Sequence, residues 1–183
     1  MEIMNSRNSP LIIAEIGVGP GAGCLGLTLC PGKKDPARRW DRGLQEDARV
    51  IRAWGAAIVV TLIEDHEFTM LGIENLQDEI RAHGMEWLHL PIRDVAVPDW
   101  RFETAWPDAR QKLHQLLDAG KRVLIHCRGG LGRTGLVAGL ILVERGVIPR
   151  DAVLRVRAAR PHAIETAAQE RYVLEAKKRS KVQ

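Results

Sequence analysis

His126-Cys-Arg-Gly-Gly-Leu-Gly-Arg-Thr-Gly135 is the stretch of sequence that decides how this chain folds. The apolar residues of 121–126 before it are typical of a buried strand, and the apolar run 136–144 after it is typical of a helix. A strand, a short glycine-rich loop and a helix N-terminus form an anion site, because the loop N–H groups and the helix dipole both favour negative charge. The sequence therefore predicts that an anion binds at this loop.

The side chains at the two ends of the loop indicate the chemistry of that site. Cys127 lies at the start, where the positive field of the loop is expected to ionise its thiol to a thiolate near neutral pH. Arg133 lies at the end, and its planar guanidinium fits two oxygens of one phosphate group. A nucleophile placed in a phosphate site predicts phosphoryl transfer through a cysteinyl-phosphate.

Two other interpretations of a glycine-rich loop fit less well. A Walker-type nucleotide loop ends in Gly-Lys-Ser/Thr, whereas this loop ends in Gly132-Arg133-Thr134 and has a cysteine that a nucleotide loop does not need. An ordinary strand-to-helix turn with a buried cysteine does not account for the spacing of Cys127 and Arg133, the glycines between them and the Thr-Gly that follows.

The ten residues 126–135 resemble the signature loop of the cysteine-dependent protein tyrosine phosphatases of the compact dual-specificity type. The resemblance is greatest to the cyclin-dependent kinase inhibitor 3 group, also called kinase-associated phosphatases. It extends over most of the chain, because residues 25–33, 91–99 and 163–169 resemble that group's N-terminal strand and loop, its general-acid loop and its glutamine-containing segment. The resemblance implies a metal-independent phosphomonoester hydrolase that needs no cofactor and acts on phosphorylated Tyr or Ser/Thr side chains of proteins.

The other residues of the loop are expected to bind phosphate mainly through their backbones, since glycine permits positive φ and a close approach. The N–H groups are expected from Arg128, Gly129, Gly130, Leu131 and Gly132. Thr134 is expected to donate a hydrogen bond to the Cys127 sulfur or to cap the following helix, and both roles stay open. The resemblance gives His126 a structural role in organising the loop, and no other His or carboxylate lies nearby at metal-ligand spacing.

A leaving alkoxide needs a proton, so one carboxylic acid should face the loop. Asp94 is the predicted acid, because it follows Pro91-Ile-Arg in a loop after a strand. Asp99 is the alternative, although capping the helix that begins near Phe102 suits it better. The acid loop does not begin with Trp-Pro-Asp, as it does in the tyrosine-specific enzymes, and this favours a dual-specificity type of site.

For several other residues the sequence leaves two roles open. The resemblance implies that Gln169 positions the hydrolytic water, and an exposed position on a helix is the alternative. Arg160 either caps a helix or adds positive field to the pocket. Cys24 and Cys30 are interpreted as small core residues, with disulfide formation to Cys127 as the alternative.

Strands that alternate with helices predict an α/β fold, a single domain with a mostly parallel central sheet flanked by helices. Strands are expected at residues 11–14, 25–29, 56–62, 85–91 and 121–126, and helices at residues 39–54, 73–83, 102–119, 136–144, 149–159 and 163–178. If the strands are parallel, the loops after Leu62, Pro91 and His126 share one edge of the sheet, which would bring Asp94 to Cys127. Residues 1–183 are expected to form this one catalytic domain, with residues 1–10 as a flexible N-terminus.

The composition of the chain indicates which binding partners and which cellular compartment to expect. The net charge of +4 is spread along the chain, so nucleic acid is not an expected partner, and the basic residues 177–181 are interpreted as a solvated helix end. The N-terminal residues do not resemble a signal peptide, and the run 136–143 is too short to span a membrane. Three cysteines that include a reactive one imply a reducing, cytoplasmic location. Oligomeric state stays open.

Two alternatives to a protein phosphatase remain. The first is a phosphatase for a small molecule or lipid of the inositol phosphate type. Enzymes with that preference tend to carry lysines in the signature loop, which here has Arg128 besides Arg133. The second is a phosphate-binding module without catalysis, and the presence of both Cys127 and Arg133 argues against it.

Overall fold

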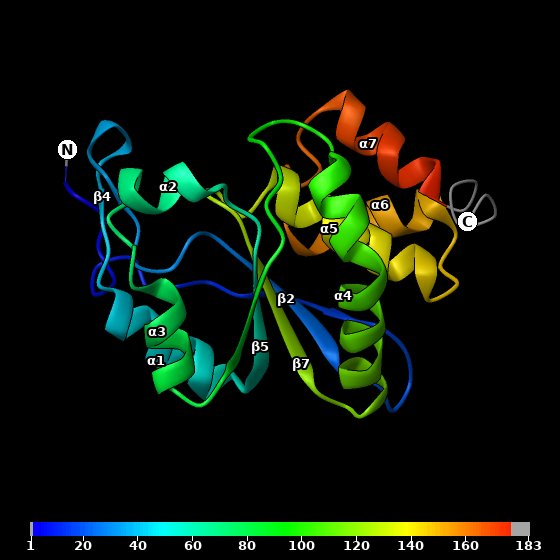
Figure 1. Cartoon of the computed structure of the whole chain (residues 1–183), viewed down its shortest axis with the longest axis horizontal. Helices are drawn as coiled ribbons and strands as arrows, with labels where there is room; N and C mark the ends of the chain where they lie inside the picture. The colour runs from blue at the N-terminus through cyan, green and yellow to red at the C-terminus, as the bar shows by residue number, and fades with distance from the viewer. Residues whose placement is uncertain (1, 177–183) are drawn as a thin grey trace.

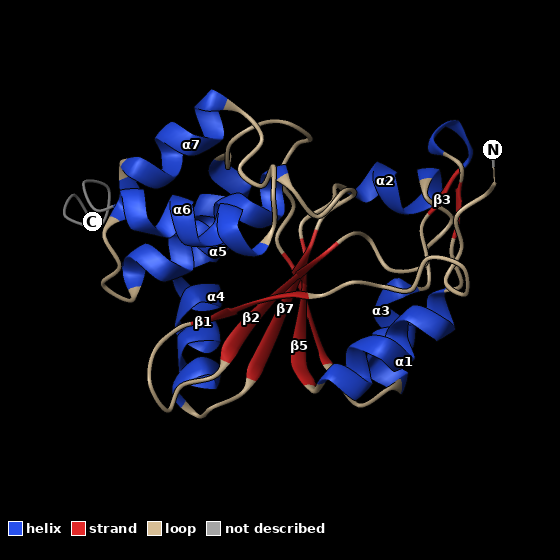
Figure 2. Cartoon of the chain, turned by 180° about the vertical axis from the view of Figure 1, so that it is seen from behind, coloured by secondary structure: helices blue, strands red, loops and turns tan. Residues whose placement is uncertain are grey.

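A five-stranded sheet forms the centre of the computed structural model, which describes residues 2–176 (Figures 1 and 2). The strands lie in the order β1-β2-β7-β5-β6. Their bounds are Ala14–Gly17 for β1, Cys24–Thr28 for β2, Ala56–Thr61 for β5, Glu86–His89 for β6 and Arg122–His126 for β7. The edge strand β1 is antiparallel to β2, and the other four are parallel to their neighbours. The predicted α/β class and mostly parallel sheet are confirmed.

Helices cover both faces of the sheet (Figures 1 and 2). One side carries α1 (Leu44–Trp54) and α3 (Leu76–Ala82). The other side carries α4 (Trp100–Asp118), α5 (Gly132–Glu144), α6 (Pro149–Ala159) and α7 (Ala167–Leu174). Helix α5 is buried from Gly132 to Val143 because it packs against the sheet, α6 and α7, which explains its almost unbroken apolar sequence.

The carboxyl ends of the parallel strands lie along one edge of the sheet. The backbone shows this alignment directly, since Leu62 N–H donates to His126 O and Ile92 N–H donates to Leu62 O. The loops that follow β5, β6 and β7 therefore meet, as the sequence predicts. Ligands of parallel α/β sheets bind at this edge.

A small arm interrupts the predicted helix at residues 39–54. Strands β3 (Lys34–Asp35) and β4 (Trp40–Asp41) pair as a hairpin around the 3-10 turn η1 (Pro36–Arg38), and this hairpin is called the arm below. Arg39 adopts a left-handed backbone with φ of 58°, which a helix cannot include. The helix consequently begins at Leu44, with Gly43 as its N-cap.

One further boundary and one helix differ from the prediction. The first strand occupies residues 14–17 instead of 11–14, because Ala14–Gly17 pairs with the second strand of a hairpin, β2. The short helix α2 (Asp65–Met70) was not predicted, since its first turn is polar and shows little apolar periodicity.

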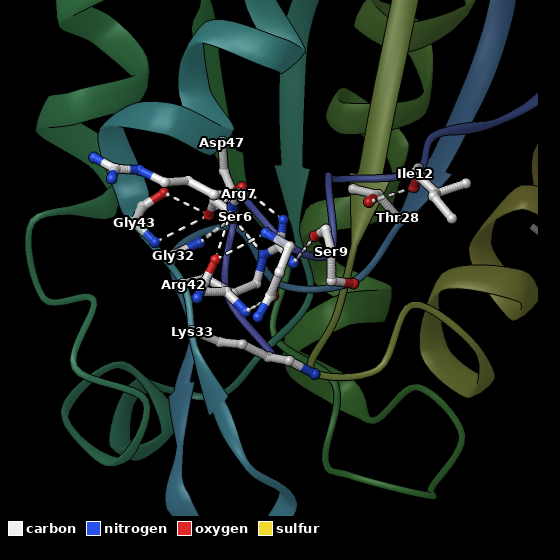
Figure 3. Close-up of polar contacts among 12 residues, drawn as sticks. Ser6, Arg7, Ser9, Ile12, Thr28, Gly32, Lys33, Arg42, Gly43 and Asp47 are labelled. Atoms are coloured by element: carbon white, nitrogen blue, oxygen red, sulfur yellow. Dashed lines mark hydrogen bonds and ion pairs between the residues drawn. The ribbon is translucent and has the colours of Figure 1, made fainter. Parts of the chain in front are cut away.

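The N-terminal segment, whose flexibility stays a prediction, packs on the arm and on α1 (Figure 3). Arg42 and Asp47 form a fully buried ion pair with N–O distances of 2.7 and 2.8 Å. Ser6 donates to Asp47 at 2.9 Å, and Ser9 O accepts from Arg42 at 2.7 Å. Met4 pairs with the backbone of Trp40. A buried charge pair requires such extra hydrogen bonds, and the segment supplies them.

The C-terminal helix begins later than the predicted range 163–178. Ile164 has φ of 57°, which prevents a helix there, and α7 begins after the N-cap Thr166. Residues 177 and 178 of the predicted helix and the basic residues 177–181 lie outside the described residues. No helix in the described range 2–176 is long and apolar enough to cross a membrane.

Candidate active site

Cys127 follows β7 directly and lies almost buried, 3% exposed, at the start of residues 127–133, called the signature loop below. Gly130 has φ of 71°, and a Cβ on it would lie 2.3 Å from Thr28 O. Only glycine fits there, because the loop turns against the end of β2 in a left-handed conformation. The loop then enters α5, whose N-cap is Leu131.

The N–H groups of residues 129–132 have no acceptor within residues 2–176. Helix α5 begins at Gly132, so these groups include the donors that every helix N-terminus leaves unpaired. The positive end of the helix dipole lies at the same place. The loop beside Cys127 thus has the donors and the field that an oxyanion needs.

Arg133 is 1% exposed and is held by a residue that sequence analysis missed. Glu67 of α2, itself 2% exposed, accepts from Nη1 at 2.6 Å and from Nη2 at 3.0 Å. Ile92 O accepts from Nη1 at 3.1 Å. Burial opposes the charge of Arg133, but the bonds to Glu67 and the nearby Cys127, Glu67 and Asp94 raise the pKa of the guanidinium above its ordinary value. Arg133 therefore stays cationic.

Asp94 lies at the same pocket, as predicted for the acid. Its Oδ1 atom is 2.9 Å from Arg133 Nη2, and its side chain is 51% exposed. The next residue, Val95, has φ of 54°, a strained conformation for a β-branched side chain, and its N–H donates to Asp94 Oδ1 at 3.1 Å. Strain of this kind is characteristic of functional loops.

Asp99, the alternative acid, caps a helix. Its side chain accepts from Arg101 N–H at 3.0 Å as the N-cap of α4. It also pairs with the Arg101 guanidinium at 2.9 Å, and the hydrogen bond from Arg101 lowers the pKa of its carboxyl. The capping interpretation of Asp99 agrees with this geometry.

His126 is fully buried under the loop and hydrogen-bonded on both ring nitrogens. Nδ1 lies 3.3 Å from Cys127 O, and Nε2 lies 2.8 Å from Thr61 Oγ1, which also accepts from Trp87 at 2.9 Å. A carbonyl can only accept, so the neutral ring carries its proton on Nδ1, and Thr61 donates to Nε2. Burial lowers the pKa of His126 to about 4, so the ring is neutral at physiological pH. This arrangement agrees with the structural role expected of His126.

Thr134 does not make either of its predicted hydrogen bonds. Its Oγ1 is buried and has no partner within residues 2–176, so it neither donates to the Cys127 sulfur nor caps α5. Arg133 Nε is also buried and unpaired in the same range. Two buried donors without acceptors are unusual, and an anion bound in the loop is one way to supply acceptors.

Gln169 is fully buried, so its predicted alternative as an exposed helix residue is wrong. Its Oε1 accepts from the N–H groups of Glu165 and Thr166 at 3.0 and 3.2 Å. Its Nε2 donates to Ala96 O at 3.1 Å, in the loop that carries Asp94. Gln169 therefore connects α7 to the acid loop.

The side chain of Arg128 points to the arm. It pairs with Asp35, which is 4% exposed, at 2.7 and 3.1 Å. The arm in turn brings Arg38 to the pocket. The lining of that pocket consists of Arg38, Asp94, Val95, Cys127, Arg128, Gly129, Leu131, Gly132, Arg133 and Glu165.

Cys30 is buried and Cys24 is partly exposed, and the pairing of either with Cys127 on oxidation stays a prediction. All three cysteines are free, and burial raises the pKa of the Cys30 thiol strongly. Within residues 2–176, no group of three or more His, Cys, Asp and Glu side chains could hold a metal ion.

Comparisons with known proteins agree with this geometry. Residues 33–147 match the family described as "Polymorphic toxin system, DSP-PTPase phosphatase". The chain is 32% identical to cyclin-dependent kinase inhibitor 3 of Mus musculus, over 82% of this chain and 70% of the relative.

Solved structures give the same result. Kinase-associated phosphatase with its catalytic-site cysteine substituted by serine has a TM-score of 0.85 and 26% identity, covering 97% of this chain and 99% of that one. Tk-PTP in its active form has a TM-score of 0.66 and 30% identity, covering 91% and 97%. The resemblance stated from the sequence is confirmed, and these relatives are cysteine-dependent phosphatases. The chain belongs to the dual-specificity protein tyrosine phosphatase family.

Proposed function

We propose that this protein removes phosphate from phosphorylated protein side chains through a cysteinyl-phosphate on Cys127. The observation that carries the proposal is that Cys127, Arg133 and Asp94 line one pocket, next to loop N–H groups that have no acceptor among residues 2–176. The whole chain serves as one catalytic domain in this proposal. A cytoplasmic location is part of it, because all three cysteines are free and the nucleophile must stay reduced.

In the first step, the thiolate of Cys127 attacks phosphorus in line with the leaving oxygen. The S–P bond forms as the P–O bond breaks, and Asp94 gives its proton to the departing oxygen. The phosphate oxygens are held by Arg133 and by the N–H groups of Gly129, Gly130, Leu131, Gly132 and Arg128. These donors stabilise the charge that spreads over the equatorial oxygens in the transition state.

In the second step, water attacks the phosphorus and the S–P bond breaks, which releases inorganic phosphate. Asp94, now a carboxylate, takes the proton of that water. We propose that the buried hydroxyl of Thr134, which has no partner in the described chain, turns to donate to the departing sulfur in this step. Gln169 is proposed to position the water through the amide proton that its bond to Ala96 leaves free.

The charges at the pocket support a substrate with a single phosphate. Arg128 is neutralised by Asp35, and Arg133 by Glu67, while Glu165 adds negative charge to the lining. Among the residues that the structure describes, Arg38 is then the remaining cation of the lining. An inositol polyphosphate would need more free cations, so phosphorylated Tyr or Ser/Thr side chains are the proposed substrates.

A panel of phosphopeptides and inositol phosphates, assayed for phosphate release in a strong chelator, tests the proposal. We expect phosphopeptide hydrolysis that vanadate abolishes, and we expect Cys127→Ser to bind tungstate without turnover, because serine lacks an ionised nucleophile. Activity that requires a divalent metal, or that persists within tenfold in Cys127→Ser, would overturn the mechanism. A clear preference for inositol phosphates would replace the proposed substrate class.

A further inference from the structure

The outer side of the signature loop is covered by two cationic side chains. Arg160 donates Nη2 to Gly129 O at 3.3 Å and Nε to Gly130 O at 3.2 Å. Lys33 Nζ donates to Arg128 O at 3.3 Å. Three consecutive loop carbonyls therefore accept from cations that come from distant parts of the sequence.

Holding the carbonyls from outside also sets the direction of the N–H groups. In a trans peptide, the C=O of one residue and the N–H of the next point in opposite directions within one plane. When the carbonyls of Gly129 and Gly130 are turned to Arg160, the N–H groups of Gly130 and Leu131 are turned to the opposite side. The phosphate proposed above needs its donors on that side.

Backbone hydrogen bonds on both sides hold Arg160 in place. It is the C-cap of α6, with its N–H bonded to Val156 O, and its own carbonyl accepts from Ala163 N–H. The side chain is half-buried, and burial lowers the pKa of its guanidinium from the ordinary value, while the nearby Cys127 opposes that change. Its guanidinium bonds to the carbonyls two and three residues after Cys127, so its positive charge lies beside the loop that carries the nucleophile.

Arg160 is not one of the residues that line the pocket in the described chain, and its donors are directed at carbonyls. Direct binding of substrate does not fit that geometry. A helix cap alone does not explain it either, because the side chain bonds to the signature loop and not to the last carbonyls of α6.

We propose that Arg160 is a positioning residue, which orients the backbone of the signature loop for anion binding and favours the thiolate of Cys127 by its charge. The inference rests on the proposed function and assigns Arg160 a place in it. It concerns binding and ionisation, so it can be tested without turnover.

Two measurements on Arg160→Met test this role. The first is the dissociation constant of tungstate, which we expect to rise about tenfold or more, as expected for losing charged hydrogen bonds behind the loop. The second is the pH midpoint for alkylation of Cys127 by iodoacetamide, followed by mass spectrometry of its peptide. We expect that midpoint to rise by about half a pH unit or more, because a nearby positive charge is gone.

Arg160→Lys separates charge from geometry and decides the question if Arg160→Met does not fold. Lysine restores the charge, so the alkylation midpoint should return to the wild-type value. A single ammonium cannot replace the planar fork at two carbonyls, so the tungstate affinity should recover only in part. If Arg160→Lys restores both the alkylation midpoint and the tungstate affinity in full, or restores neither, the separate roles of charge and geometry are contradicted.

Arg157→Met is the matched control. Arg157 also extends from α6, and it bonds to Ala163 O, Ile164 O and Glu170. Its loss should lower stability without moving the alkylation midpoint or the tungstate affinity. The inference would be overturned if Arg157→Met and Arg160→Met changed the two measurements equally. It would also be overturned if the tungstate dissociation constant of Arg160→Met stayed within twofold of the wild-type value. If wild-type enzyme binds tungstate but releases no phosphate from any substrate, the proposed function fails while Arg160 is still tested.

Discussion

Asp94 and Arg133 form an ion pair across the pocket, with Asp94 Oδ1 2.9 Å from Arg133 Nη2. The two partners differ greatly in burial, since Arg133 is 1% exposed and the Asp94 side chain is 51% exposed. A phosphate that binds Nη2 has to displace the carboxylate from it. Substrate entry would then move Asp94 from the arginine to the leaving oxygen, where the proposed mechanism needs a protonated carboxyl.

Asp94→Asn should slow alkyl phosphoesters much more than activated aryl phosphates, because an acidic phenol departs almost unaided. It should also remove the basic limb of the pH–rate profile, which reports loss of the acid's proton. Rates on serine phosphopeptides and on p-nitrophenyl phosphate test this expectation. Asp99→Asn is the control, and it should keep both the wild-type rate on alkyl phosphoesters and the basic limb of the profile. If Asp99→Asn shows the two losses and Asp94→Asn does not, Asp99 is the acid.

Glu67→Gln should weaken phosphate binding, because Arg133 loses the carboxylate that fixes its fork. Breaking a buried ion pair costs about 3–5 kcal/mol of folding stability, so the variant should also unfold more easily. Steady-state kinetics and urea unfolding measure the two effects. Asp65→Asn, on the same helix but with an 89% exposed side chain, should change neither. An unchanged KM in a folded Glu67→Gln would show that Arg133 needs no support from α2.

Gln169→Ala tests whether this amide positions water or only holds the acid loop. A water-positioning residue acts in the second step, so its loss should let the cysteinyl-phosphate accumulate. Loss of the bond to Ala96 O alone should slow both steps, since Asp94 takes part in each. Acid quenching with mass spectrometry of the Cys127 peptide distinguishes the outcomes. A low, wild-type level of phosphoenzyme together with slow turnover would reject the role in positioning water.

His126 should make the protein less stable in acid. Its pKa is lowered from 6.5 to about 4 by burial, so the unfolded chain takes up a proton in a pH range where the folded protein does not. Stability is therefore fully present above pH 6.5 and falls as the pH drops toward 4, by about 3 kcal/mol in total. Urea unfolding at several pH values in this range gives the free energy of unfolding as a function of pH. That free energy should depend less on pH in His126→Asn than in wild type, and the exposed His162→Asn should show the wild-type dependence. The same pH dependence of the unfolding free energy in all three proteins would refute the role of His126 in acid destabilisation.

The titration of Lys33 should make anion binding weaker at alkaline pH. Burial lowers the pKa of its ammonium to about 8, opposed by the nearby Cys30 and Asp35, so its charge behind the signature loop is lost as the pH rises through that value. Tungstate affinity should fall near pH 8 in wild type, whereas Lys33→Met should bind more weakly at neutral pH and lack that step. Lys34→Met, which removes an exposed lysine next to it, should retain the wild-type profile. A step that persists in Lys33→Met belongs to another group.

The sequence is sufficient to predict the signature loop because its chemistry is local. Cys127 and Arg133 lie on one loop between a strand and a helix, so their meeting follows from a short stretch of chain. The position of Asp94 at the pocket was also predictable, since parallel strands bring their carboxyl ends to one edge. The boundaries of α1 and α7 were not, because single left-handed residues, Arg39 and Ile164, decide where those helices begin.

Glu67 illustrates what sequence alone does not reveal. It lies in a short polar helix whose sequence suggests a solvated surface, yet it is buried against Arg133. The carbonyl contacts of Arg160 are hidden for the same reason, since they depend on how the chain after α6 turns back to the loop. Partners that meet across the fold leave no pattern of spacing in either segment.

The packing of the N-terminal segment has a practical consequence for handling this enzyme. Met4 pairs with Trp40 of the arm, Ser6 bonds to Asp47, and the arm carries Arg38 to the pocket. A protease cut within residues 4–9 would remove contacts that hold the arm, which forms one wall of the pocket, even though these residues lie far from Cys127 in sequence. Variants compared by their kinetics should share one identical N-terminus, with any purification tag placed at the other end of the chain.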